Sequence, residues 1–80
     1  MPITIDDPEV EALFQRLRQW RMETARAQGV PPYVIFHDAT LLAVATARPR
    51  RRRDLEGLPG VGAAKLERYG DGLLAVVSDG

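Results

Sequence analysis

Residues 48–53 form the most strongly charged segment of the chain, with five arginines and no acid. The arginines are Arg48, Arg50, Arg51, Arg52 and Arg53. They precede a predicted short helix, although the electropositive start of a helix disfavours exposed arginines. A sequence that accepts this conflict is suited to binding an anion or an acidic partner surface. Guanidinium groups that neutralise phosphates would give a salt-dependent affinity for nucleic acid. A solubilising loop is the alternative interpretation.

A glycine-rich turn of the helix-hairpin-helix type is predicted at residues 58–65. Gly60 and Gly62 allow the backbone to turn sharply and to approach another surface closely. The free amides at the start of the following helix can hold a phosphate, and Lys65 can add a positive charge. The alternative is a structural turn in which Val61 is inserted into the core.

A tyrosine follows two prolines in the sequence Pro31-Pro32-Tyr33. The prolines stiffen the backbone and hold the tyrosine at a defined place. An exposed, fixed tyrosine is a stacking platform for an unpaired base, worth about 1–3 kcal/mol. A partly buried tyrosine whose hydroxyl reaches water is the alternative.

Acidic residues cluster near the start of the chain: Asp6, Asp7, Glu9 and Glu11. The eleven basic and eleven acidic residues of the whole chain cancel, so the net charge is zero. Because the Debye length at physiological salt is about 8 Å, the acidic and basic clusters act separately across a folded domain. Zero net charge argues against strong non-specific nucleic-acid binding, and the acidic cluster is a candidate protein interface.

The chain lacks the residue types that catalysis and metal binding commonly use. It has no cysteine, and its single histidine, His37, is interpreted as a loop residue. No Ser-His-Asp set or carboxylate pair can be argued from the spacing. We therefore predict a non-enzyme without cofactor, metal, small-molecule substrate or membrane-spanning segment.

Helices must position these groups, since no segment alternates with a period of two. One long helix is predicted from Asp7 to Gln28, with Asp6 or Asp7 as its cap and Gly29 at its end. Its apolar residues have helical spacing: Val10, Leu13, Phe14, Leu17 and Trp20.

Shorter helical segments are expected after an extended stretch, Val30–Pro32. They are Tyr33 to Phe36, Asp38 to about Ala47, Arg52 to Gly57, Ala63 to Tyr69, and a last turn or two from Asp71 to Val77. Asp38 is expected to cap its helix, and Gly70 to end the helix before it. The predicted fold is all-α, a compact bundle of four to five short helices. One domain spans residues 1–80, with its core at about 10–77 and a tail or linker at 1–6.

Five sequence blocks, in order, resemble the helicase and ribonuclease D C-terminal (HRDC) domain, most closely that of bacterial RecQ helicases. They are Leu13-Phe14 with Leu17-Arg18 and Trp20-Arg21, Gly29 to Phe36, Asp38 to Leu41, Pro59 to Gly62, and Lys65 to Gly70. The resemblance implies a five-helix, non-catalytic auxiliary domain that weakly binds single-stranded or branched DNA and regulates which structures the helicase acts on. It also implies an ATP-dependent 3′–5′ DNA helicase as parent, acting in DNA repair and recombination in the bacterial cytoplasm at the nucleoid. We expect this chain to be a piece of that helicase without the motor.

The resemblance carries over to particular residues. Tyr33 matches an exposed tyrosine of the family's single-strand-binding surface, and Lys65 with the Gly60–Gly62 turn matches elements around the hairpin. Arg48 to Arg53 departs from the family, which usually has a Thr or Ser cap and fewer charges there. The acidic start and the zero net charge are further departures.

Two functions follow. In the first, Tyr33 stacks on a base while Arg50 to Arg53 and Lys65 neutralise phosphates. In the second, the domain has little DNA binding of its own, and its segregated charges dock on other domains of the helicase or on a partner. A basic patch contiguous with Tyr33 would favour the first function. An acidic face opposite an isolated arginine cluster would favour the second.

Overall fold

The chain begins with its longest helix, α1, at Pro8–Gln28 in a computed structural model that describes residues 6–79. The Asp7 carboxylate accepts a hydrogen bond of 2.9 Å from the Glu9 backbone N–H, which caps the helix. At the other end Gly29 has φ of 69°, the left-handed conformation that glycine adopts without strain. The helix begins one residue later than predicted, with Asp7 as its cap, and its predicted end at Gln28 and Gly29 is confirmed. The predicted tail at 1–6 falls, apart from Asp6, outside the described residues.

Two helices follow, α2 at Pro32–Ile35 and α3 at Asp38–Ala47. Pro32 was expected to be extended, but it opens α2, because proline tolerates the first position of a helix. The prediction that Asp38 caps α3 is wrong. His37 is the N-cap residue and makes no side-chain cap bond, while the Asp38 carboxylate forms an ion pair with Arg21 instead.

The last two helices are α4 at Arg52–Leu55 and α5 at Ala63–Ser78. The predicted end of α4 at Gly57 is two residues too late. The predicted end of a helix at Gly70 is also wrong, because α5 continues through it. Gly70 is buried, and a Cβ there would lie 3.1 Å from Leu66 Cδ1 and 3.8 Å from Leu55 Cδ1. Gly70 therefore serves the close packing of α5 against α4 and does not end the helix.

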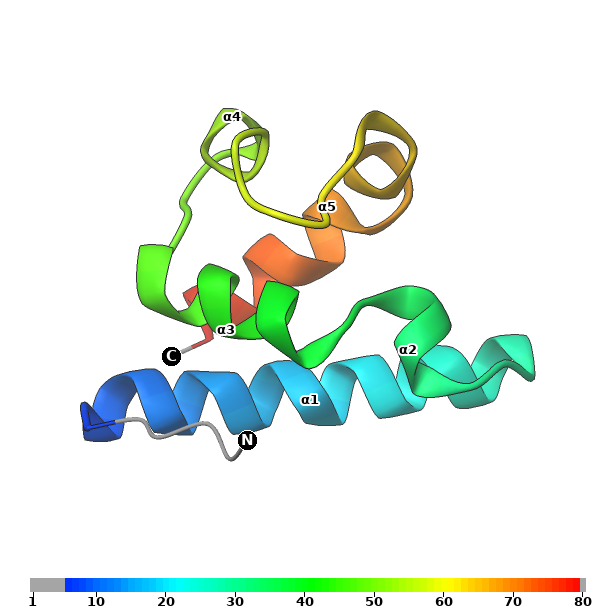
Figure 1. Cartoon of the computed structure of the whole chain (residues 1–80), viewed down its shortest axis with the longest axis horizontal. Coiled ribbons are helices and arrows are strands. Elements are labelled where there is room, and N and C mark those ends of the chain that lie inside the picture. The colour runs from blue at the N-terminus through cyan, green and yellow to red at the C-terminus, as the bar shows by residue number, and fades with distance from the viewer. Residues whose placement is uncertain (1–5, 80) are drawn as a thin grey trace.

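α1 forms the base of the molecule, and α2, α3 and α5 pack on it, while α4 packs on α5 (Figure 1). The molecule measures 32 × 26 × 24 Å. Each of the helices α1 to α5 contributes to one core, whose fully buried aliphatic side chains include Leu17, Ile35, Leu41, Leu55 and Leu73. Within residues 6–79 every regular element is a helix, so the all-α prediction is confirmed. No helix in this range is long and apolar enough to cross a membrane.

Candidate nucleic-acid interface

Tyr33 is held outward by its neighbours in α2. It is 61% exposed, whereas Ile35 and Phe36 are almost completely buried. Pro31 is extended, and its carbonyl accepts a hydrogen bond of 3.0 Å from the Val34 N–H. The buried residues after Tyr33 and the proline turn before it fix the backbone, so the ring is held in the exposed position and not in the partly buried one.

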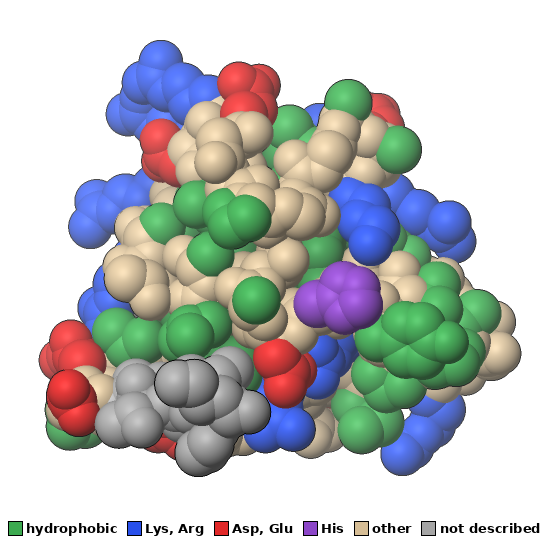
Figure 2. Space-filling model, viewed as in Figure 1, with side chains coloured by type: hydrophobic (Ala, Val, Ile, Leu, Met, Phe, Trp, Pro, Cys, Tyr) green, Lys and Arg blue, Asp and Glu red, His purple; other side chains and the backbone are tan. Residues whose placement is uncertain are grey.

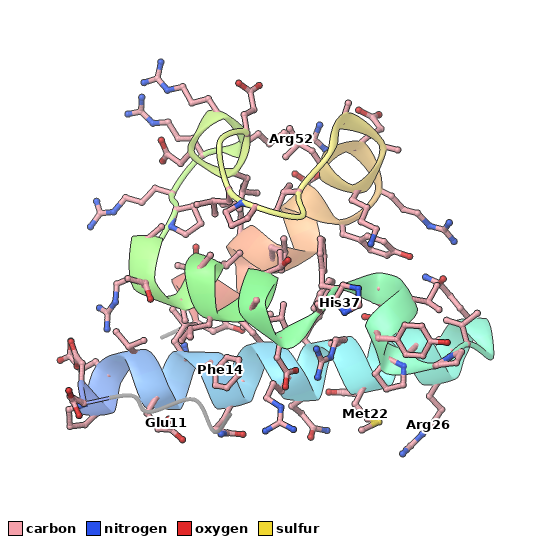
Figure 3. All side chains as sticks on the ribbon, in the orientation of Figure 1. Glu11, Phe14, Met22, Arg26, His37 and Arg52 are labelled. Atoms are coloured by element: carbon pink, nitrogen blue, oxygen red, sulfur yellow. The ribbon has the colours of Figure 1, made fainter. Side chains whose placement is uncertain are left out.

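His37 lies against Tyr33, at the junction of α2 and α3 (Figure 3). The two ring centroids are 6.2 Å apart and the rings are inclined by 26°. Both side chains are exposed. The sequence interpretation of His37 as a plain loop residue therefore overlooked an aromatic neighbour of Tyr33, four residues away.

Two cations of α5 lie over buried aromatic rings, and one of these rings belongs to Phe36, the residue before His37. Lys65 Nζ is 5.2 Å from the centroid of the Phe36 ring, and the Arg68 guanidinium is 5.4 Å from that of Tyr69. The two rings meet edge to face, with centroids 5.7 Å apart. Neither cation lies within 4.0 Å of a carboxylate among residues 6–79. We call Tyr33, His37, Lys65 and Arg68 the Tyr33 surface.

A buried arginine braces this surface from beneath. Arg21 donates a hydrogen bond of 2.9 Å from Nη1 to the Phe36 carbonyl, and its Nη2 lies 2.7 Å from Asp38 Oδ1. Its side chain is about one-tenth exposed, and its buried Nε has no partner within the described chain. Arg21 thereby joins α1 to the segment between α2 and α3. A sequence signal existed, because Arg21 stands four residues from both Leu17 and Ala25 on the buried face of the helix.

Two of the five clustered arginines are held by acids. Arg48 Nη2 lies 3.0 Å from Glu9 Oε2, across the start of α1. Arg52 binds Asp71 with two hydrogen bonds of 3.0 and 3.1 Å, which fasten α4 to α5. The Arg52 guanidinium lowers the pKa of the Asp71 carboxyl through these bonds and its charge. These two arginines are therefore engaged in structure.

The guanidinium groups of the other three, Arg50, Arg51 and Arg53, have no carboxylate within 4.0 Å among residues 6–79. The backbone N–H groups of Arg50 and Arg51 donate to Asp54 Oδ2, at 3.1 and 3.2 Å. These bonds, that from Arg50 foremost, lower the pKa of the Asp54 carboxyl and cap α4. We call Arg50, Arg51 and Arg53 the arginine corner. Basic side chains project over α4 in Figure 2, well apart from the purple His37.

The glycine-rich turn packs against α3. Val61 is buried, as in the structural alternative. Gly60 has φ of 81°, and a Cβ there would overlap the Thr40 hydroxyl. A Cβ on Gly62, by contrast, would meet no atom within 4 Å. Gly60 therefore serves the packing of the turn, while Gly62 leaves the start of α5 open to solvent.

The acidic start does not form a face opposite the arginines. Asp7 caps α1, Glu9 pairs with Arg48, and Glu11 accepts a hydrogen bond of 3.1 Å from Gln15 Nε2. Asp6 is exposed. Within residues 6–79, no three side chains of the ligating types His, Cys, Asp and Glu are grouped to hold a metal ion.

The predicted site residues thus fall into separate places. Lys65 lies with Tyr33; Arg50, Arg51 and Arg53 lie around α4; and Arg48 and Arg52 are paired. Sequence reasoning missed His37, Arg68 and Arg21, all of which the fold brings to the Tyr33 surface or beneath it.

Comparisons with known proteins agree with this architecture. The family model for the HRDC domain matches residues 10–77. The ATP-dependent DNA helicase UvrD2 of Mycobacterium tuberculosis is 46% identical over 67 residues, which are 84% of this chain and 10% of the helicase. The ATP-dependent DNA helicase RecQ of Haemophilus influenzae is 39% identical over 67 residues, again 84% of this chain and 11% of the helicase.

A solved structure described as D. radiodurans RecQ HRDC domain 3 superposes with a TM-score of 0.84 at 33% sequence identity. The match covers 88% of this chain and 92% of that one. By contrast, the chain spans only about a tenth of the length of the helicases that it matches.

Proposed function

This chain belongs to the HRDC domain family, and we propose that it is a non-catalytic auxiliary domain of a bacterial DNA helicase of the RecQ or UvrD type. In this role it binds single-stranded or branched DNA weakly and regulates the structures on which the motor acts. The parent helicase works in DNA repair and recombination, in the cytoplasm at the nucleoid. The binding residues are those of the Tyr33 surface.

One observation carries the proposal. Tyr33 is exposed on a backbone fixed from both sides and lies against His37, while Lys65, which no described acid neutralises, lies over the ring of Phe36, the residue before His37. A fixed aromatic ring loses little entropy when a base stacks on it, and base–aromatic stacking contributes about 1–3 kcal/mol. Nearby lysine and arginine side chains attract the phosphates that flank the base. The patch is small, which fits an affinity in the micromolar range or weaker.

The test is binding of a fluorescent single-stranded oligonucleotide by anisotropy, at low and at physiological salt. We expect Tyr33→Ala to weaken binding about tenfold, because it removes the stacking platform. We expect Lys65→Ala and Arg68→Ala to weaken it a few-fold each and to reduce the salt dependence. Gln15→Ala, which replaces an exposed polar residue of α1 outside the Tyr33 surface, is the control. Absence of binding by the unmodified chain at low salt would refute the proposal.

A second candidate function is docking on a protein surface, and the arginine corner is the observation that favours it. Asp54 accepts hydrogen bonds from the Arg50 and Arg51 backbone, and the neighbouring Arg52 binds Glu67 and Asp71, so the local field is mixed in sign. A mixed field attracts a polyanion less than a uniformly basic one, but it suits an acidic protein surface of complementary pattern.

The triple variant Arg50→Glu, Arg51→Glu, Arg53→Glu separates the two functions. If the arginine corner docks on a protein, the variant keeps nearly the DNA affinity of the unmodified chain while Tyr33→Ala loses it. If the corner binds phosphates, the triple variant weakens DNA binding strongly and flattens its salt dependence. Circular dichroism confirms that each variant is folded.

A further inference from the structure

The Tyr33 and His37 rings lie close together and nearly parallel. They come from different elements, since Tyr33 lies in α2 and His37 precedes α3, and the buried Phe36 anchors the backbone between them. Their centroids are 6.2 Å apart and their planes are within 26° of parallel. Two successive stacking intervals of about 3.4 Å add up to about 6.8 Å. The rings must therefore move apart to hold a flat base between them.

A hollow opens beside the two rings. It has a volume of about 420 Å³ and is lined by Arg21, Pro32, Tyr33, His37 and Asp38. Arg21 is nine-tenths buried, and its Nε is without a partner within the described chain. A half-exposed carboxylate at the rim, Asp38, is already paired with Arg21. The carboxylate of Asp38 in the lining repels a phosphate but can accept a hydrogen bond, so the hollow suits the edge of a nucleobase better than a phosphate.

We propose that His37 is a second stacking residue, and that Tyr33 and His37 hold one unpaired nucleobase between their rings. This inference rests on the proposed function and adds a residue to its site. The base enters from solvent, and its edge faces the hollow lined by Arg21 and Asp38. Lys65 lies over the ring of Phe36, the residue before His37. In that place Lys65 can contact a flanking phosphate. No bond forms or breaks in this step.

The inference predicts a particular pattern of affinities. If both rings hold the same base, removal of either one loses most of the stacking. The double substitution then costs little more than a single one, whereas two independent contacts would give multiplied losses. His37 is suited to this test because its side chain makes no cap bond to α3, so its replacement removes no helix cap.

The test uses a fluorescent oligothymidylate of about 15 nucleotides, whose bases can stack on either ring. The variants are Tyr33→Ala, His37→Gln, their combination, and His37→Phe, which keeps an aromatic ring. We expect about a five- to tenfold loss of affinity for each of the first two and less than a further twofold loss for the combination. His37→Phe keeps the original affinity. An oligonucleotide of equal length that lacks the bases binds as weakly as the double variant.

Three other results are informative. If Tyr33→Ala weakens binding and His37→Gln does not, His37 is no part of the site and this inference fails while the proposed function stands. If His37→Phe binds as weakly as His37→Gln, the ring does not act by stacking and the inference fails in the same way. If the unmodified chain does not bind, the proposed function itself fails. Thermal unfolding of every variant excludes loss of folding as the cause.

Discussion

The Tyr33 surface and the arginine corner both present cations to solvent, but they are held in opposite ways. The Tyr33 surface is braced from within. The Phe36 and Tyr69 rings lie under its two cations, and Arg21 binds the Phe36 carbonyl from a buried position. The arginine corner is held on α4, a helix of four residues, fastened to α5 on its exposed side by the pair of Arg52 and Asp71.

The difference shows that charge density in the sequence does not measure charge available for binding. The sequence places five arginines together, yet two of them are paired with acids and the other three share their surface with carboxylates. Lys65 and Arg68 stand 12 and 15 residues after the end of that run, and the fold alone places them over the Phe36 and Tyr69 rings. Buried bracing favours a fixed binding geometry, while exposed ion pairs respond to salt and pH.

The largest effect is expected at Gly60, where the turn between α4 and α5 meets α3. Gly60→Ala should lower the free energy of unfolding by about 2–4 kcal/mol, because alanine is strained at positive φ and its Cβ overlaps Thr40. Denaturant unfolding measures this loss. Such a result would show that the arginine corner also depends on a buried contact. The Tyr33 surface and the arginine corner would then differ less in how they are held.

Gly62→Ala is the matched control for this prediction. Gly62 has φ of −82°, and a Cβ there meets no atom within 4 Å. The loss should stay below about 1 kcal/mol, the order of a changed N-cap residue. Equal losses at the two glycines would contradict the packing role assigned to Gly60.

The next effect tests the bracing of the Tyr33 surface. Arg21→Ala should lower the free energy of unfolding by about 2 kcal/mol, because it removes a charged hydrogen bond to the buried Phe36 carbonyl. Arg18→Ala is the control on the same helix. Arg18 Nε lies 4.0 Å from the same Asp38 carboxylate but is half exposed, so its loss should cost less than about 0.5 kcal/mol. Similar costs for the two variants would mean that burial does not distinguish the two ion pairs.

A smaller effect, dependent on pH, is expected at the arginine corner. The pKa of Asp71 is lowered from its ordinary value of 3.8 by Arg52, so the unfolded state binds the proton more readily than the folded state. The resulting stability is fully present above about pH 4 to 5, and it is lost as the pH falls through the lowered pKa. Asp71→Asn should flatten this part of the stability profile, measured by thermal unfolding between pH 2 and 6.

Arg52→Ala removes the cause of the same pKa shift and should flatten the same range. Asp54, whose pKa is lowered by the Arg50 and Arg51 amides, keeps a residual slope in both variants. A profile that remains as steep in Asp71→Asn as in the original chain would show that the pair does not fasten α4 to α5.

Sequence periodicity sufficed for α1 to α3 because their signals are local. The Asp7 cap, the glycine at the end of α1 and the prolines around α2 act within a few residues. Gly29 and Gly70 show the limit of such signals. Both follow helical segments, but Gly29 takes a left-handed conformation in open space, whereas Gly70 continues the helix because α4 packs against it. That packing joins segments far apart in sequence, and no local pattern reveals it.

The candidate site was predictable only in part, for the same reason. Tyr33 follows from its prolines and from the family resemblance. The role of His37 depends on the turn between α2 and α3 that sets its ring against Tyr33, and that of Arg68 on the packing of Tyr69 against Phe36. Those of Arg48 and Arg52 depend on acids 39 and 19 residues away. Residue type gave the arginines their charge, but only the fold decides which charges are already neutralised.

The smallest effect is expected at Arg48, where the run of arginines begins. Arg48 ends α3 with φ of 49°, a left-handed conformation that is strained for a residue with a side chain. Arg48→Gly should gain about 1 kcal/mol by relieving this strain, and it should lose at most about 0.5 kcal/mol with the exposed Glu9 pair. The net result is a stabilisation of about 0.5 kcal/mol in denaturant unfolding, with DNA affinity unchanged. A clear destabilisation by Arg48→Gly, with an equal one by Glu9→Gln, would show that the exposed Arg48–Glu9 pair contributes more to stability than the strain at Arg48 costs. Exposed ion pairs would then stabilise this molecule more than the comparison of the Tyr33 surface with the arginine corner implies.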